Sequence, residues 1–293
     1  MKRLVLIDGH AIIHRAYHAL PTMTLPNGEQ VHAVYGFISM LFRIIEQLKP
    51  THLAVAFDLP GITFRQELYL AYQSQRQQTE EGLIGQFQIV RDVTSSANIP
   101  VCIAEGFEAD DVIGTLSHQC IGKDKVDEVI IVTGDRDILQ LVTDKVKVFI
   151  PIKGLSEGRL FGEKDVEEYL GIKPSQVVDY KALVGDSSDN YPGVPGIGPK
   201  TATALLTKYG TFANIYKALS RHWVLSEKIK EKLTQGYESG KLSKQLAQIE
   251  INVPIKIEVK EAILPDLKNN EKFIKKLEEL RFKSLISRIG AEN

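Results

Sequence analysis

Cysteine, tryptophan, long apolar runs and net charge are all scarce in this sequence. The 293 residues include two cysteines and one tryptophan. Cys102 and Cys120 form neither a metal-ligand spacing nor a disulfide framework, so we expect buried thiols and a reducing compartment such as the cytoplasm. No apolar run approaches bilayer length, and the N-terminal LVLID is too short for a signal peptide. These absences leave the class of ordinary globular proteins.

The first half of the chain alternates short apolar runs with helical patterns. A run at 145–150 alternates in polarity and predicts a further strand, at an edge. Helical spacing at 33–49 and 108–120 separates the strands, which predicts an α/β fold with a parallel sheet. The nearly continuous runs, typical of strands buried on both faces, are 3–8, 52–58, 101–104 and 128–133.

From about residue 163 the sequence changes to short helical patterns. We therefore divide the whole chain into a region 1–162 and a region 163–293. Residues 252–258 predict a short extended piece. Residues 270–290 predict one amphipathic helix, or two broken near Phe282. Trp223 is interpreted as a core residue. The short helices are predicted at EKDVEEYLG, PSQVVDYKALVG, PKTATALLTKYG and TFANIYKALS.

Nine carboxylates stand where a parallel sheet would gather them. Those that follow strands fall at the sheet edge where ligands bind, and others open a helix or precede a glycine-rich turn. A single one would be read as a cap or a surface charge. Together, so many anions require cations, and Mg²⁺ or Mn²⁺, as two or more ions, suits their oxygens. The nine are Asp8, Asp58, Glu108, Asp110, Asp111, Asp135, Asp137, Asp186 and Asp189.

The net charge of −1 conceals a separation of charge. Setting these nine acids aside from the 37 leaves 28 against 36 lysines and arginines. The rest of the protein therefore carries an excess of positive charge that suits a polyanion.

The stretch GVPGIGPKTATALLTKYG predicts a turn followed by a helix. Glycines permit the tight turn, and backbone N–H groups at a helix start bind phosphate oxygens without reading bases. A structural turn between helices is the alternative, which the adjacent GDSSDN makes less favoured. The candidate DNA contacts in this stretch are Gly193, Gly196, Ile197, Gly198, Lys200, Thr201 and Lys208.

Seven motifs in order, LIDGH, AVYGF, VAFD, FRQELY, GFEADD, TGDRD and GDSSDNYPGVPGIGPKTA, resemble the 5′ nuclease domain of bacterial DNA polymerase I, of the flap endonuclease family. The resemblance implies a PIN-like α/β core followed by a helix-hairpin-helix region. It implies cleavage of DNA at 5′ flaps, nicks and 5′ ends, including RNA primers, in replication and repair. It also implies K⁺ held by hairpin carbonyls, a monomer, no membrane, and possible fusion to a polymerase.

The same resemblance implies roles for the polar, glutamine-rich segment 62–88. It matches a helical arch that a 5′ end threads, although a plain surface helix is the alternative. Arg65 and Arg76 would contact phosphate, and Tyr72 would stack on a base or simply pack. Gln73 stands where the family has a lysine, so we expect a slowed nuclease.

His10, His14 and His18 recur every four residues, which could place three imidazoles on one helix face for Zn²⁺. Local packing beside Asp8 is the interpretation we favour, with His10 or Arg15 near DNA. Two other functions stay open at this point. The chain could be a junction-binding module with impaired chemistry because of Gln73. It could also be a PIN-like ribonuclease, which would need fewer acids and no hairpin.

Overall fold

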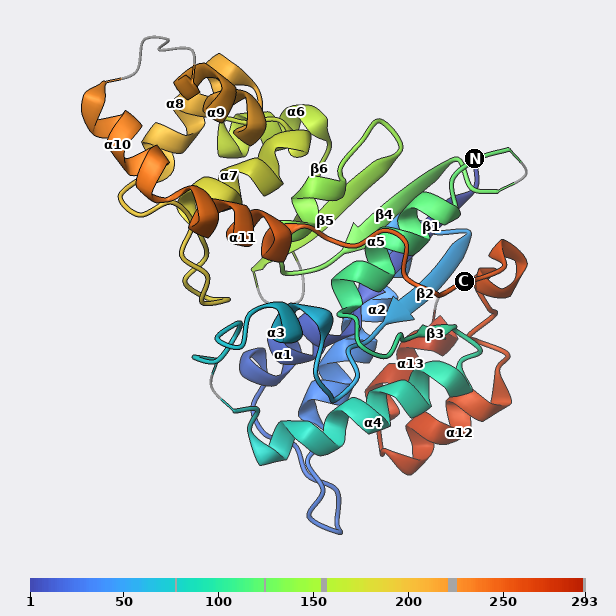
Figure 1. The fold of residues 1–293 in the computed structure, drawn as a ribbon. Coiled ribbons are helices and arrows are strands. Elements are labelled where there is room, and N and C mark those ends of the chain that lie inside the picture. The colour runs from blue at the N-terminus through green and yellow to red at the C-terminus, as the bar shows by residue number, and fades with distance from the viewer. Residues whose placement is uncertain (77, 124, 154–156, 221–225, 292–293) are drawn as a thin grey trace.

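The computed structural model of the chain describes residues 1–76, 78–123, 125–153, 157–220 and 226–291, and within them one six-stranded sheet (Figure 1). The strand order is β3-β2-β1-β4-β5-β6, and only β6 runs antiparallel to its neighbour. The strands are β1 (Arg3–Asp8), β2 (His52–Ala56), β3 (Val101–Cys102), β4 (Glu128–Val132), β5 (Val146–Lys153) and β6 (Glu157–Phe161).

The expected parallel α/β sheet is confirmed, with one error at its edge. The run at 145–150 is not an edge strand, because β6 folds back and pairs outside it. This hairpin was missed because β6 is short and largely polar, with one buried residue, Phe161. The second and third predicted strands extend beyond the observed ones, since pairing stops at Ala56 and Cys102.

Alternate residues of β1 separate two hydrophobic clusters on the two faces of the sheet. Val5 and Ile7 face one cluster, and Leu4 and Leu6 face the other. The helices on the Val5 face, some from opposite ends of the chain, are α1 (Gly9–Ala19), α2 (His32–Leu48), α4 (Glu81–Ser96), α12 (Glu271–Glu279) and α13 (Lys283–Ala291). The Leu4 face is covered by α5 (Ala109–Gln119).

A group of short helices gathers beyond β5 and β6, at the upper left of Figure 1. The four predicted helices are observed, and α10 and α11 are additional elements that the sequence analysis missed. Trp223 lies outside the described residues. The group comprises α6 (Glu163–Leu170), η2 (Pro174–Gln176), α7 (Val177–Val184), α8 (Pro199–Tyr209), α9 (Phe212–Ser220), α10 (Glu227–Gln235) and α11 (Tyr237–Ala247).

The chain after α11 returns to the sheet along α5. Its backbone bonds to that helix, as when Val253 N–H donates to Thr115 Oγ1 at 3.1 Å. Residues 252–258 form no strand, and the 3₁₀ turn η3 (Val259–Ala262) follows. The tail is two helices, α12 and α13, which lie beside α4 (Figure 1). Our division at residue 162 stays a prediction, but these last helices pack on the core.

No helix in the described parts of the chain combines the length and apolarity that crossing a bilayer demands.

Candidate active site

The carboxyl ends of three parallel strands place three aspartates at one edge of the sheet. Asp8 is the last residue of β1 and caps α1, accepting a hydrogen bond from Ala11 N–H at 2.9 Å. Its second oxygen accepts from the Thr133 hydroxyl at 2.6 Å, just after β4. Asp58 follows β2, and Asp135 follows β4. The sheet topology therefore brings these side chains together, as the sequence predicted.

The N-terminus of α5 adds two more carboxylates to this edge. Glu108 is the residue before the helix, and Asp110 lies in its first turn. The first backbone N–H of α5, from Ala109, donates to Asp58 at 2.6 Å. Free N–H groups and the helix dipole favour negative charge at this end, so the acids and the helix start stabilise each other.

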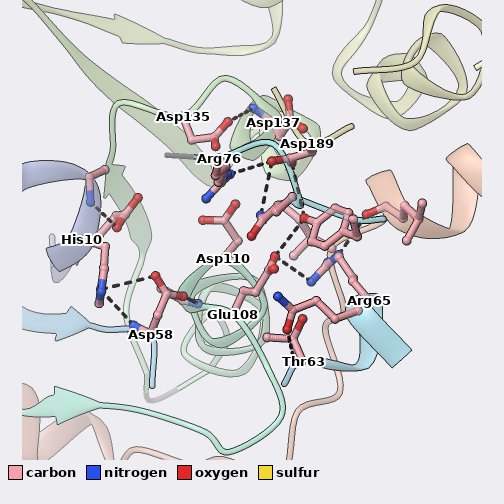
Figure 2. Close-up of a pocket in the computed structure, with 18 of the residues that line it drawn as sticks. His10, Asp58, Thr63, Arg65, Arg76, Glu108, Asp110, Asp135, Asp137 and Asp189 are labelled. Atoms are coloured by element: carbon pink, nitrogen blue, oxygen red, sulfur yellow. Dashed lines mark hydrogen bonds and ion pairs between the residues drawn. The ribbon is translucent and has the colours of Figure 1, made fainter. Parts of the chain in front are cut away.

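These acids line one open cavity of about 600 Å³ (Figure 2). A smaller hollow of about 270 Å³ continues from it and includes Asp186 with Asp135, Asp137 and Asp189. Seven of the nine predicted ligands line the larger cavity: Asp8, Asp58, Glu108, Asp110, Asp135, Asp137 and Asp189.

Asp111 does not join them, and this corrects its prediction as a metal ligand. Its side chain is fully buried and forms two bonds of 2.7 Å with the Arg65 guanidinium. It also accepts the backbone N–H of Glu250 at 2.8 Å. With Arg65 beside it, both carboxylate oxygens are engaged inside the protein.

Arg65 was predicted to contact phosphate, and the structure instead places it inside the protein. Its side chain is 3% exposed and donates to Glu108, Asp111 and the backbone carbonyls of Leu246 and Gln248. These donors join the start of α5 to the end of α11. The guanidinium is therefore committed to protein partners, because a buried charge is stable only when paired.

The segment expected to form a helical arch is mostly turns. The helix α3 spans only Phe64–Leu68, and residues 69–76 and 78–80, which the structure describes, contain no helix before α4 begins at Glu81. α4 itself buries Leu83, Val90 and Val93 in the core, so it is not an exposed excursion. The helical prediction for 62–88 is therefore wrong over 69–76, where contacts with residues distant in sequence hold the chain in turns.

Those contacts centre on Asp189. Arg76 pairs with its carboxylate at 2.6 Å (Figure 2). The Gln73 side-chain amide donates to the same carboxylate at 3.2 Å, and the Tyr72 hydroxyl donates to it at 3.3 Å. The Tyr72 ring is buried and stacks on Tyr191 at 6.5 Å between centroids, so it packs within the protein. The three polar side chains line the cavity and face the predicted metal ligands.

Lys181 on α7 is a site residue that sequence reasoning missed. Its ammonium lies 2.6 Å from Asp137 and also pairs with Asp186. Desolvation opposes its charge, but the two carboxylates prevail and raise its pKa. The signal was present in DYKALVGD, where the lysine precedes Asp186 by just over one helical turn.

Several acids that line the cavity have raised pKa values. Burial first, and then neighbouring Asp58 and Asp135, raise the pKa of Asp8 to about 7. Burial also raises the pKa of Glu108 to about 7, and burial with Asp135 raises that of Asp137 to about 6. The pKa of Asp110 is raised in the same way. Burial first, and neighbouring carboxylates second, therefore favour the protonated form of these acids, which a bound cation would reverse.

The donor chemistry of the cavity fits a hard divalent cation, since every crowded donor is a carboxylate oxygen. In the described part of the chain, no three acidic, histidine or cysteine side chains converge closely enough to enclose an ion. Lysine and arginine instead pair with three of the acids: Lys181 with Asp137 and Asp186, and Arg76 with Asp189.

The histidines of α1 are explained by local contacts. The His10 ring stacks on Phe87 at 4.3 Å, and its Nδ1 accepts the Asp58 N–H at 3.1 Å. His14 lies 5.6 Å from the same phenyl ring, whereas His18 contacts Tyr17. Arg15 is half-buried on the same helix and does not line the cavity.

The glycine-rich turn leads into α8 as predicted. Gly198 precedes the helix, Pro199 is its first residue, and Lys200 is exposed in the first turn with Thr201 half-buried behind it. Lys208 lies at the far end, over the Tyr209 ring.

Two predicted contacts in the turn are used internally instead. Gly193 is buried, and its N–H donates to Ser243 Oγ at 2.9 Å. Ile197 has a buried side chain. Gly196 and Gly198 are exposed, so the open part of the turn is its second half.

Comparisons with known proteins show the family to which the chain belongs. The N-terminal, resolvase-like domain of 5′-3′ exonuclease matches residues 3–171, and the C-terminal SAM fold of 5′-3′ exonuclease matches residues 172–272. The chain belongs to the 5′-3′ exonuclease family. It is 40% identical over 288 residues to DNA polymerase I of Bacillus caldotenax, and 38% identical over 292 residues to that of Bacillus subtilis.

These matches cover 98% and 100% of the chain but 32% and 33% of the relatives, so the chain spans about a third of their length. Among solved structures, the T5 D15 protein co-crystallised with metal ions has a TM-score of 0.67 at 19% identity, covering 98% of both chains. The catalytic core of Rad2 in complex with DNA has a TM-score of 0.57 at 16% identity, covering 98% and 92%. The likeness confirms the predicted PIN-like fold.

Proposed function

We propose that this chain is a metal-dependent, structure-specific 5′ nuclease that hydrolyses phosphodiesters near 5′ flaps and nicks. The observation that carries the proposal is the cavity lined by seven carboxylates from five separated segments. The family and the name of its DNA polymerase I relatives support DNA as the substrate. Removal of primers and repair of DNA are the processes this activity would serve.

Two Mg²⁺ or Mn²⁺ ions in the cavity would supply an activated water and neutralise charge on the leaving oxygen. Asp8, Asp58, Glu108, Asp110 and Asp135 would hold one ion, and Asp137, Asp186 and Asp189 the other. Lys181 and Arg76 pair with the acids of the second group. The two cations line the smaller hollow beside these acids and would also face a DNA backbone that enters it.

The α8 turn would hold backbone phosphate away from the cut. Its exposed glycines and Lys200 offer N–H donors and charge without contacts to bases. Asp189 and Gly196 both belong to the connection between α7 and α8, so the acids and the turn are adjacent in sequence. The distance between metal and turn would thus set where the strand is cut.

The deciding experiment uses a duplex with a labelled 5′ flap, incubated with the protein in Mg²⁺, in Mn²⁺ and in EDTA. Asp135→Asn is compared with Asp144→Asn, which removes an exposed acid outside the cavity. We expect cutting at the junction that EDTA and Asp135→Asn abolish and Asp144→Asn preserves. Cleavage that persists in EDTA would refute the metal mechanism.

Gln73 favours a second candidate, a junction-binding module with impaired chemistry. Gln73 offers an amide where the resemblance implies a lysine, and this amide donates to Asp189. Tight flap binding without cleavage in either metal would establish this alternative. Cleavage of single-stranded RNA with no preference for a DNA junction would instead indicate the PIN-like ribonuclease.

A further inference from the structure

The turn between α7 and α8 is the place where the sequence resemblance implies a bound K⁺ ion. A bare cation there would need several backbone carbonyl oxygens facing a common point. The structure commits three of them to donors of the protein. Gly193 O accepts from the Ser239 hydroxyl, Val194 O accepts from Ile197 N–H at 3.0 Å, and Gly196 O accepts from Lys232 Nζ at 2.7 Å.

Lys232 covers the turn closely, in addition to making this one bond. Gly196 has a positive φ of 80°, and a β-carbon built on it would lie 2.9 Å from both Lys232 Cε and Nζ. Glycine therefore leaves the space that the end of the lysine side chain fills. A side chain at position 196 would displace the ammonium as well as strain the turn.

The helix that carries Lys232 is anchored on the same turn. A β-carbon at Gly236, the residue that ends α10, would lie 2.7 Å from Val194 Cγ1 and 3.0 Å from Pro195 Cδ. Leu233 beside Lys232 is fully buried, and its carbonyl accepts the Tyr216 hydroxyl at 3.0 Å. Folding thus fixes the backbone of Lys232, so the ammonium is positioned before DNA arrives.

An ammonium group has the charge of K⁺ and, like K⁺, is bound by carbonyl oxygens. Its hydrogen bond to Gly196 O is charge-assisted, and such bonds are stronger than neutral ones. Lysine carries three donors, so two remain for phosphate oxygens beyond the one used on the carbonyl. A tethered cation at this point performs the electrostatic task that a bound ion would otherwise perform.

We propose that the Lys232 ammonium supplies the cation of the turn, so that this chain holds the DNA backbone there without a bound potassium ion. The inference rests on the proposed function, because it assumes that the turn binds DNA. It differs from what the family resemblance implies for this turn, since the structure gives the carbonyl of Gly196 to a side chain.

The test is the affinity for a labelled 5′-flap duplex, measured by fluorescence anisotropy with divalent ions chelated so that the strand stays uncut. Chlorides of potassium, sodium and tetramethylammonium are compared at equal ionic strength, since tetramethylammonium is too large for a carbonyl site. We expect the three dissociation constants of the natural chain to agree. Affinity several-fold higher in potassium than in tetramethylammonium would overturn the proposal.

Variants of α10 provide the second arm of the test. Lys232→Met should weaken binding by about tenfold and lower the slope of log affinity against log salt by about one. Lys230→Met removes the same charge from a side chain that pairs with Glu227 and should bind like the natural chain. Lys232→Arg keeps the charge and should retain most of the affinity. Equal binding by the two methionine variants would overturn the proposal.

The outcomes also separate this inference from the proposed function. Failure of the natural chain to bind any flap or nicked duplex in all three salts would refute DNA binding itself, and the inference with it. Binding that depends on potassium would refute the inference alone. Thermal unfolding followed by circular dichroism establishes that each variant folds, and the salt comparison on the natural chain needs no variant.

Discussion

Asp110 and Asp111 are neighbours in sequence that take different roles at the scale of single residues. Asp110 lines the acidic cavity, whereas Asp111 is buried against Arg65 and Glu250 N–H. Successive residues of a helix point in different directions, so the side chains of Asp110 and Asp111 diverge in the first turn of α5. The motif EADD therefore predicted the right element, and the orientation of the second aspartate came from packing.

We predict that Asp111→Ala lowers the free energy of unfolding by about 3–5 kcal/mol, because it breaks a buried ion pair and removes two of the bonds that satisfy the Arg65 guanidinium. Urea denaturation measures this change. Arg159→Ala is the matched control, since it breaks an ion pair with Asp165 that is more than 40% exposed on both sides and should cost under about 1 kcal/mol. Similar losses for both variants would show that Arg65 finds other partners.

We predict that Gln73→Lys accelerates single-turnover cleavage of a 5′ flap by about fivefold. A charged donor exceeds a neutral amide by roughly 1 kcal/mol in such contacts, which corresponds to that factor in rate. Gln73 lies on the cavity with its amide on Asp189, so the new ammonium would face the same space. An unchanged single-turnover rate would contradict the proposed effect of the missing lysine.

At the scale of elements, the connection from α7 to α8 depends on a close backbone approach. Gly185 has a φ of 74°, and a β-carbon there would lie 2.5 Å from Tyr191 O. The loop closes on itself through paired bonds between Asp186 and Tyr191. This closure holds Asp186 and Asp189 beside Lys181 and Arg76, so the position of two predicted ligands depends on one glycine.

We predict that Gly185→Ala costs about 2–4 kcal/mol, from the positive φ and the clash together, and also reduces cleavage. Gly28→Ala is the matched control: its φ of 87° carries the same backbone penalty, but nothing lies within 4 Å of the added carbon. That variant should lose only about 1 kcal/mol. Equal urea midpoints for the two would mean that the loop can move aside.

At the scale of the whole molecule, the chain ends are tied into one core. Phe273 of α12 is fully buried and meets Phe42 of α2 edge-on at 6.2 Å. The same cluster includes Val5 and Ile7 of β1 and Val90 of α4. The C-terminal helices thus complete one face of the sheet that also carries Asp8.

We predict that Phe273→Ala lowers the free energy of unfolding by about 3–5 kcal/mol, by opening a cavity in this cluster. Ile263→Ala, at a side chain that is 56% exposed, should change it by under about 0.5 kcal/mol. Urea unfolding of the two variants compares them directly. A small loss for Phe273→Ala would indicate that α12 is dispensable to the core.

The sequence alone determined the parallel sheet, the strand ends that carry Asp8, Asp58 and Asp135, and the turn before α8. These features depend on local periodicity and on glycine and proline, which act over a few residues. For the tail it left two outcomes, one amphipathic helix or two helices, because the helical pattern is interrupted near Phe282.

Only the tertiary structure decided which charges face the cavity and which are paired inside. Arg65 meets Asp111 across 46 residues, and Arg76 meets Asp189 across 113. The placement of Lys232 on Gly196 likewise joins segments 36 residues apart. Such pairings depend on burial and on competing partners, which the order of residues along the chain does not specify.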